Sequence, residues 1–158
     1  GIDPTVGELS DKKTFIFSGA AADPSCRNQR SLKNRLIKKK EAGAQFIQTQ
    51  MVMEKANLIE FCEKISQPLE IPVIAGVFLL KSYKNALFIN KYVPGANIPE
   101  IILSRLKDAK DPLKEGIKIA SEQAHDFINI ADGIHLMAIK AEHLIPEILK
   151  KADLNLEY

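Results

Sequence analysis

The chain has few cysteines, no long apolar run and little net charge, and each of these absences removes a class of protein. Its two cysteines, Cys26 and Cys62, are far apart and have no CxxC spacing. The sequence therefore predicts neither a zinc knuckle nor a disulfide framework, and a cytoplasmic location is expected. No apolar run reaches the roughly 18 residues that a membrane helix needs, and the first residues show no charged and apolar signal pattern. The 22 basic and 20 acidic residues nearly balance, so whole-chain charge gives no reason to expect nucleic acid or membrane as a partner.

Length and composition fit one ordinary globular domain. The chain has 158 residues, of which 46% are hydrophobic and 27% are charged. This is enough to bury a single core and excludes a disordered or fibrous protein. No low-complexity linker divides the chain, so residues 1–158 are expected to form one domain. Because residue 1 is Gly rather than Met, we interpret it as a processing site, an engineered boundary or the first residue kept from a longer chain.

Short apolar segments alternate with longer amphipathic segments along the chain. The short ones are rich in β-branched or aromatic residues, which is typical of buried strands. The longer ones carry apolar residues three and four positions apart, which is typical of helices. Gly43 has the position of a helix C-cap, and Asp111 with Pro112 has that of an N-cap with a first-turn proline. The expected strands are residues 14–20, 45–51, 72–79 and 133–140. The expected helices are residues 30–42, 55–65, 83–91, 99–109, 112–131 and 142–151.

This alternation predicts an α/β fold with parallel strands and right-handed helical crossovers. The strands are largely apolar rather than cleanly alternating, as expected for parallel strands that helices cover. Four such strands form either a small open sheet or part of a barrel, because a complete eight-stranded barrel needs about 250 residues. In such folds ligands bind beyond the carboxyl ends of the strands. The residues that leave each strand are therefore the first candidates for a site.

Two strand exits carry small or polar residues. Residues 19–24, GAAADP, either let a flat ligand approach the backbone or form a tight turn that needs no ligand. Gln48, Thr49 and Gln50 close the second strand, in a segment that should be buried. A buried amide without a hydrogen bond costs about 1–3 kcal/mol. We therefore expect at least one of these glutamines to meet either a protein partner or a ligand.

A tyrosine, a basic segment and three histidines complete the candidates. Tyr83 follows the third strand next to Ser82, a candidate N-cap, and either stacks on a planar ring or packs in the core. The basic residues between positions 27 and 40 either grip phosphates or form a solvated helix face beside the buried Leu32 and Leu36. The histidines have no metal-ligand spacing with the cysteines, so no metal site is predicted. We assign no chemistry to His125, His135 and His143.

Several segments, taken together, resemble the methylenetetrahydrofolate reductase family. The segments are, in order, 17–24 (FSGAAADP), 39–50 (KKEAGAQFIQTQ), 74–82 (IAGVFLLKS), 93–95 with 98–99, 133–139 and 145–148. They resemble, in the same order, IGAAANP, KVEAGADFIQTQ, ILAGVLPLKS, VPGIRIPE and the ending common in acetogen-type members. Leu80 lies one place beyond a turn that usually carries proline. The resemblance extends from near Gly1 to about Leu154.

The resemblance implies a TIM-barrel flavoenzyme of one-carbon metabolism. This chain would then be the C-terminal half of a (β/α)8 barrel, with about four of its strands. Family members bind a flavin, usually FAD, and pass hydride from it to 5,10-methylenetetrahydrofolate. The product is 5-methyltetrahydrofolate, which serves methionine biosynthesis. The electron donor, either a reduced nicotinamide or a ferredoxin-linked partner, is left open.

The resemblance also assigns roles to five residues. Gln50 matches the strand-end glutamine that hydrogen-bonds the pterin, and Tyr83 matches an aromatic position that packs on folate or nicotinamide. Ala21 and Asp23 match flavin contacts, although Asp23 is an altered residue type. Lys39 matches a lysine near the flavin phosphates.

Two functional groups of the family are expected outside this chain. The general acid, a Glu at the end of the first barrel strand, and an acidic residue near the flavin pyrimidine ring both belong to the N-terminal half. The chain is then a fragment, a split-gene subunit or an inactive paralogue. We expect an oligomer in which the N-terminal half or a second copy pairs with the open edge strands. The alternative is a catalytically inactive half-barrel binding or scaffold protein that self-associates.

Overall fold

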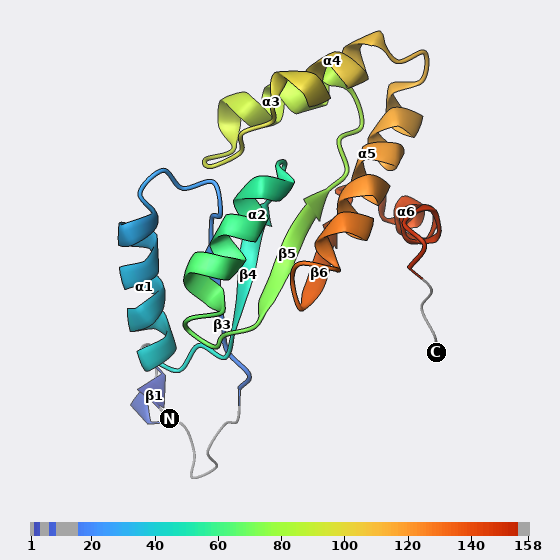
Figure 1. Ribbon diagram of the computed structural model, residues 1–158. Coiled ribbons are helices and arrows are strands. Elements are labelled where there is room, and N and C mark those ends of the chain that lie inside the picture. Colours follow the sequence, from blue (N-terminus) through green and yellow to red (C-terminus); the bar gives the residue numbers. More distant parts are fainter. Residues whose placement is uncertain (1, 4–6, 9–15, 155–158) are drawn as a thin grey trace.

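The computed structural model describes residues 2–3, 7–8 and 16–154 and contains a four-stranded parallel sheet (Figure 1). A separate antiparallel pair joins β1 (Ile2–Asp3) and β2 (Gly7–Glu8). The strands of the main sheet follow one another in space as in the chain, and each neighbouring pair is parallel. They are β3 (Gly19–Ala22), β4 (Phe46–Met51), β5 (Val73–Phe78) and β6 (Gly133–Met137). Sequential parallel strands joined by helices are the arrangement of a TIM-barrel-type fold, so the predicted fold class is confirmed.

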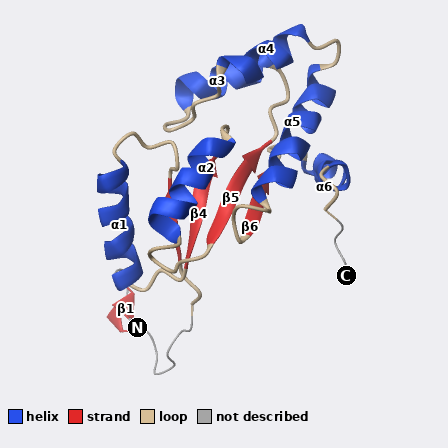
Figure 2. Cartoon of the chain, in the orientation of Figure 1, coloured by secondary structure: helices blue, strands red, loops and turns tan. Residues whose placement is uncertain are grey.

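Helices follow each strand of the main sheet. The first two crossovers are α1 (Gln29–Glu41) and α2 (Lys55–Phe61), and the third contains α3 (Tyr83–Tyr92), α4 (Glu100–Asp108) and α5 (Pro112–Phe127). The chain then continues through a 3₁₀ turn, η2 (Glu142–Leu144), into α6 (Ile145–Lys151), which packs on α5. α1, α2 and α5 lie along the sheet, whereas α3 and α4 lie beyond the carboxyl ends of its strands (Figure 2). No helix in residues 16–154 is long and apolar enough to cross a membrane.

The two faces of the sheet differ in burial. Ala20 and Ile47 are buried under the helices, whereas Ala21 and Gln48, their neighbours in the same strands, are exposed. We call the face with Ala20 and Ile47 the helix-covered face, and the face with Ala21 and Gln48 the open face. The helix-covered face forms the larger core, whose fully buried side chains include Phe61, Phe127, Leu36, Leu58, Val73 and Val77. Burial of this kind contributes about 1.5–3 kcal/mol per large apolar side chain, so this face holds most of the fold's apolar stabilisation.

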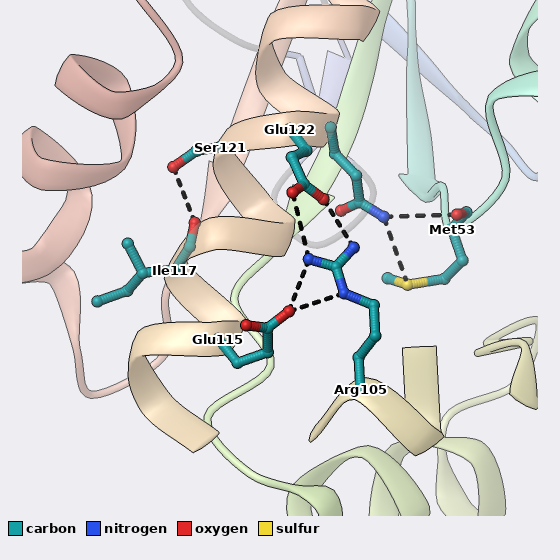
Figure 3. Close-up of polar contacts among 7 residues, drawn as sticks. Met53, Arg105, Glu115, Ile117, Ser121 and Glu122 are labelled. Atoms are coloured by element: carbon teal, nitrogen blue, oxygen red, sulfur yellow. Dashed lines mark hydrogen bonds and ion pairs between the residues drawn. The ribbon is translucent and has the colours of Figure 1, made fainter. Parts of the chain in front are cut away.

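A second core closes the carboxyl end of the sheet. It joins the end of β5 to α3, α4 and one face of α5, and its members include Phe78, Leu80, Ile102, Leu106 and Ile119. Arg105 fixes α4 on α5 from the outside of this core (Figure 3). Its Nε donates to Glu115 Oε1 at 2.7 Å, and its Nη1 donates to Glu122 Oε2 at 2.7 Å. These two carboxylates raise the pKa of Arg105, with the hydrogen bond to Glu122 as the largest cause.

The predicted helix ends are confirmed at three places. The Asp111 carboxylate accepts a hydrogen bond from the backbone N–H of Lys114 at 3.1 Å and caps α5. The Ser82 hydroxyl accepts one from the N–H of Asn85 at 3.1 Å and caps α3. Gly43 follows α1 with φ of 102°, a backbone conformation that glycine adopts without strain.

The strand predicted at residues 14–20 is only partly correct, because Gly19 and Ala20 belong to β3 whereas residues 16–18 do not. Residues 14–15 lie outside the described residues, and the strand that pairs with β4 is Gly19–Ala22. Ile16 and Phe17 precede it with side chains that are 74% and 69% exposed. Phe17 stacks on Phe46 with 5.4 Å between the ring centroids. The apolar residues gave the strand signal, whereas glycine and alanine, which form the actual strand, have little strand preference.

Two helices end earlier than predicted. The helix expected at residues 55–65 changes at Cys62 into a π-helical turn, η1 (Cys62–Ser66). The helix expected at 112–131 ends at Phe127, and the chain turns through the next residues into β6. Ile128 accordingly is exposed and does not extend the buried stripe of the helix.

Candidate functional site

A hollow of about 740 Å³ runs along the edge strand β3, from its first residue, Gly19, to Asp23 just beyond its carboxyl end. It runs from the inner side of α1 onto the open face of β4, so both faces of β3 contribute to it. Its lining residues are Gly19, Ala20, Ala21, Ala22, Asp23, Leu32, Arg35, Leu36, Lys39, Phe46, Gln48, Thr49, Gln50 and Met137. This volume falls in the range of small-molecule sites, about 300–1,000 Å³.

β3 forms a wall of the hollow that carries only small side chains. It consists of one glycine and three alanines, and Ala21 turns its exposed side toward the open face. Lys39 reaches over from the last turn of α1, where its Nζ donates to the backbone oxygen of Ala21 at 2.8 Å. A long basic side chain is thus held beside a strip of backbone that a flat molecule can approach closely.

The exit of β3 is a turn stabilised by Asp23. Its Oδ1 accepts hydrogen bonds from the backbone N–H of Ser25 at 2.9 Å and from the Ser25 hydroxyl at 2.6 Å. The loop between α3 and α4 lies against this turn at Gly95, whose φ is 81°. The positive φ favours glycine, and a Cβ at position 95 would lie 2.8 Å from Asp23 Oδ2 and would have to displace that carboxylate. The turn after β3 and the α3–α4 loop therefore meet at the carboxyl end of β3.

A β-bulge at the end of β4 sets the position of Gln50. The pairing with β5 shifts between Gln48 and Met51. The buried Thr49 hydroxyl accepts a hydrogen bond from the N–H of Gly76 at 2.9 Å and donates one to the Gln50 carbonyl at 2.7 Å. A Cβ on Gly76 would lie 2.8 Å from the same carbonyl oxygen, so only glycine lets the bulge form here. Bulges next to active sites redirect side chains in this way.

The Gln50 side chain is only lightly engaged. Its Oε1 accepts from the N–H of Met51 at 3.0 Å, and its Nε2 donates to the carbonyl of Pro94 at 3.4 Å. The second distance lies beyond the usual range for an N–H···O bond. The half-buried Gln50 amide can therefore exchange this bond for a ligand at little cost.

The open face carries a polar pair next to an aromatic pair. Gln48 Nε2 lies 2.8 Å from His135 Nδ1. Phe46 lies in the same strand, and its ring covers Gly19 closely enough that a Cβ there would lie 2.4 Å from it. The prediction that at least one glutamine of this strand meets a protein partner or a ligand is confirmed by the contact of Gln48 with His135. The prediction that this segment is buried is wrong for Gln48, which is exposed. Gln48 is exposed because it points to the open face, which α1, α2 and α5 do not cover.

The charges around the hollow are mainly positive. Arg35 and Lys39 line it from α1, and Asp23 is the one acidic residue in its lining among the described residues. The predicted solvated face of α1 is thus only partly right, because these two cations turn toward the hollow. Lys33 turns elsewhere and donates to the backbone oxygen of Lys64 at 3.2 Å. An anionic ligand fits this balance of charge.

Neither cysteine chemistry nor a metal centre is built into the hollow. Cys62 is buried in the core, and burial raises the pKa of its thiol. Cys26 is half-buried and does not line the hollow. Within the part of the chain that the structure describes, no group of three or more His, Cys, Asp and Glu side chains could hold a metal ion.

Four of the five residues assigned by resemblance come together here. Ala21, Asp23, Lys39 and Gln50 all line the hollow. Tyr83 does not, because it begins α3 and packs, half-buried, against the second core. Phe46 and the His135 that contacts Gln48 were not predicted as site residues, and Arg35 was considered only as one member of the basic segment. Arg35 lies one helical turn before Lys39, and that spacing was the signal in the sequence.

The order and chemistry of these segments can be compared with known proteins. The sequence profile of the family described as methylenetetrahydrofolate reductase matches residues 18–153. This is most of the chain and includes every residue that lines the hollow. The chain belongs to the methylenetetrahydrofolate reductase family. The predicted family is thereby confirmed.

A solved structure shares the fold of this reductase-family chain. It is an uncharacterized protein from Clostridium thermocellum, described as binding two copies of 5-methyl-5,6,7,8-tetrahydrofolic acid. The TM-score is 0.65 at 18% sequence identity, over 86% of this chain and 52% of the other. The chain thus spans about half the length of that protein. A search of the curated proteins gives no match.

Proposed function

We propose that this chain supplies the flavin- and folate-contacting side of a methylenetetrahydrofolate reductase. The reaction is the reduction of 5,10-methylenetetrahydrofolate to 5-methyltetrahydrofolate, with reducing equivalents that come through FAD from a nicotinamide or another donor. One observation carries the proposal: three elements bring the family-matched Ala21, Lys39 and Gln50 to the lining of one hollow. Family membership and the folate bound by the structural neighbour support it.

The residues of the hollow fit a flavin. The wall of β3 has no side chain larger than a methyl group, so a planar ring can approach its backbone. Arg35 and Lys39 offer cationic groups to the phosphates. When bound, a flavin supplies two-electron hydride chemistry, and this chain's part is to hold it, to orient the folate and to set the local charge.

Gln50 is the proposed folate contact. Its amide offers both a donor and an acceptor, and its bond to Pro94 is long enough to be replaced. The redirected end of β4 holds it between the β3 exit and the α3–α4 loop, so a pterin held by Gln50 would lie next to the wall of β3.

The reduction also needs a proton donor, and the hollow does not provide an evident one. Asp23, the acidic residue of its described lining, uses Oδ1 for the Ser25 turn. We propose that the general acid comes from outside residues 16–154, in an N-terminal half of the barrel. The same half would cover the open face and pair with β3 and β6, each of which has a single neighbouring strand in the described sheet.

Ligand titration of the full chain tests this proposal. We expect 5-methyltetrahydrofolate to bind, and Gln50→Leu to weaken binding about tenfold, the effect of one well-placed hydrogen bond. We expect Lys39→Met to weaken FAD binding by at least as much, because a charged hydrogen bond is lost. Gln67→Leu and Lys38→Met are the matched controls, since neither residue lines the hollow. Equal binding by all four variants would contradict the proposal.

A half-barrel that binds folate without catalysis is the second candidate. The open face and the two single-neighbour edge strands favour it, because such edges promote self-association. Formation of 5-methyltetrahydrofolate from 5,10-methylenetetrahydrofolate, FAD and reduced nicotinamide, together with the mass of the particle in solution, separates the two. A dimer that binds folate but forms no product even with an N-terminal half of the barrel present would favour the second candidate. If the monomer kept its flavin through purification, this would contradict both candidates, because each needs a second half-barrel to complete the site.

A further inference from the structure

A hydrogen-bonded pair, Gln48 and His135, spans three strands of the open face. Gln48 belongs to β4 and His135 to β6, with β5 between them. Neighbouring strands lie about 4.8 Å apart, so the two side chains must reach toward each other across β5 to meet at 2.8 Å. His135 pairs in register with Gly76 of β5, a position that has no side chain to separate them.

The pair lies at the hollow. Gln48 is exposed and belongs to the lining, two residues before Gln50 in the same strand. Both residues line the hollow, so both amides lie on the ligand side. The pair is therefore placed to take part in recognition rather than in packing.

His135 determines which atoms Gln48 offers. A primary amide has two N–H donors and one oxygen acceptor. When the Nδ1 of a neutral His135 accepts one N–H, Gln48 keeps its oxygen and its second N–H. When the imidazole is protonated, Nδ1 can only donate, so the amide must turn its oxygen toward His135 and keep only N–H groups for a ligand.

The charged groups around this pair lie outside its three strands. β4, β5 and β6 contain no other charged or titratable side chain. The charged residues that line the hollow are Asp23, Arg35 and Lys39. Asp132, just before β6, accepts from the backbone N–H of Val73 at 2.8 Å, and Lys81 donates to the backbone oxygen of Ile139 at 2.9 Å. α5 packs on β6 as part of the helix layer.

We infer that Gln48 contacts the ligand through hydrogen bonds to a cyclic-amide edge. His135 is the positioning residue that decides whether Gln48 offers its oxygen together with an N–H, or N–H groups alone. The oxygen and the remaining N–H of Gln48 match a ring edge that presents N–H next to C=O. Both the pteridine of folates and the isoalloxazine of flavins have such an edge. Acidification should then weaken binding, because the protonated His135 takes the acceptor of Gln48 away from the ligand. This inference rests on the proposed function of the hollow.

The pairing can be tested without a ligand. In the ¹⁵N-labelled full chain, we expect the side-chain amide signals of Gln48 to shift between about pH 8 and about pH 5, where histidine changes its charge. The shift should be absent in His135→Asn, in which the side-chain oxygen replaces Nδ1 as an acceptor that does not titrate. Gln48 signals that ignore pH, or that titrate equally in His135→Asn, would overturn the role of His135.

The contact is tested by titration with 5-methyltetrahydrofolate and, separately, with FAD. For whichever ligand Gln48 reads, we expect the affinity of the natural chain to fall about threefold to tenfold over the same pH range, the effect of one neutral hydrogen bond. His135→Asn should keep the affinity seen at high pH throughout the pH range. Gln48→Leu and His135→Phe should bind weakly at both high and low pH. His143→Asn and Gln67→Leu, at exposed positions outside the hollow, are controls that should behave like the natural chain.

The outcomes separate this inference from the proposed function. Tight binding of a ligand with the same pH profile in the natural chain and in His135→Asn would overturn the inference and leave the proposed function intact. Binding of neither ligand would defeat the proposed function and the contact at Gln48 together. The dependence of Gln48 on His135 would in that case still be decided by the amide signals.

Discussion

The helix-covered face and the open face of the same sheet are built for different tasks. Ile47 and Gln48 are neighbours in β4, yet the first is fully buried under the helices and the second is exposed at the hollow. The covered face contains aliphatic and aromatic side chains that pack with α1, α2 and α5. The open face contains glycine, alanine, glutamine and histidine together with the stacked Phe17 and Phe46. Stability and recognition are thus divided between alternate residues, so substitutions can address one without the other.

The largest contrast is expected between Ile47→Ala and Gln48→Ala. The first empties a site in the core and should lower the free energy of unfolding by about 2–5 kcal/mol. The second should change it by less than about 0.5 kcal/mol, as at most surface positions, while it weakens ligand binding. Chemical denaturation with a parallel ligand titration measures both quantities. Similar losses of stability in the two variants would remove the distinction between the faces.

Gly116→Ala should produce the next largest effect. α5 approaches the end of β5 so closely that a Cβ on Gly116 would lie 1.8 Å from the backbone oxygen of Leu80. Alanine normally favours a helix over glycine by about 1 kcal/mol, so a net loss of about 2 kcal/mol would show that the backbone clash dominates. Gly133→Ala is the matched control, because nothing lies within 4 Å of a Cβ there. A stabilised Gly116→Ala variant would contradict the close contact.

A smaller effect is expected for Arg105→Met. This residue joins α4 to α5 through Glu115 and Glu122, with side chains that are partly exposed. Its removal should cost about 1 kcal/mol, at the upper end for such ion pairs. The difference from the natural chain should shrink as salt is added. Ligand affinity should not change, since Arg105 joins α4 to α5 and does not line the hollow. Lys64→Met, which breaks an exposed i,i+4 pair with Glu60, is the control and should leave stability nearly unchanged.

The smallest effect is expected for Asp111→Asn, and only its pH dependence is informative. The backbone N–H of Lys114 is the main cause that lowers the pKa of Asp111. A carboxylate with a lowered pKa stabilises the fold above its ordinary pKa, and this contribution is lost as the pH falls through the lowered value. Asparagine keeps the cap without titrating. The unfolding curves of the two proteins should therefore converge below about pH 4. A constant difference down to the lowest pH would contradict this role.

The sequence predicted the strands and helix caps well, but it did not predict the contacts of the open face. β4 and β5 lie where their β-branched residues indicated, and the caps at Ser82 and Asp111 are correct, because these features depend on local chemistry. β6 begins where predicted but ends at Met137, before the predicted end at Lys140. β3 was misplaced because its alanines carry no strand signal. The pairing of Gln48 with His135 depends on the register across a third strand, which no local pattern specifies.

The residues assigned by resemblance also differ in how well the sequence could place them. Ala21, Asp23, Lys39 and Gln50 gather at the hollow because parallel strands end at one edge of the sheet. Tyr83 occupies the same edge in sequence order but begins a helix whose first turn packs into the second core. The direction of its side chain depends on the packing of α3 and α4, which the sequence alone did not specify.

The most direct test of this account is to map the binding site of 5-methyltetrahydrofolate on the backbone amide signals of the ¹⁵N-labelled chain. The account predicts that the signals that shift belong to Ala21–Asp23, to Gln48–Gln50 and to the loop around Gly95. Those of α4 and α5 around Arg105 and Glu122 should stay in place. Shifts centred on α4 and α5, or no shifts at saturating ligand, would contradict the assignment of recognition to the open face.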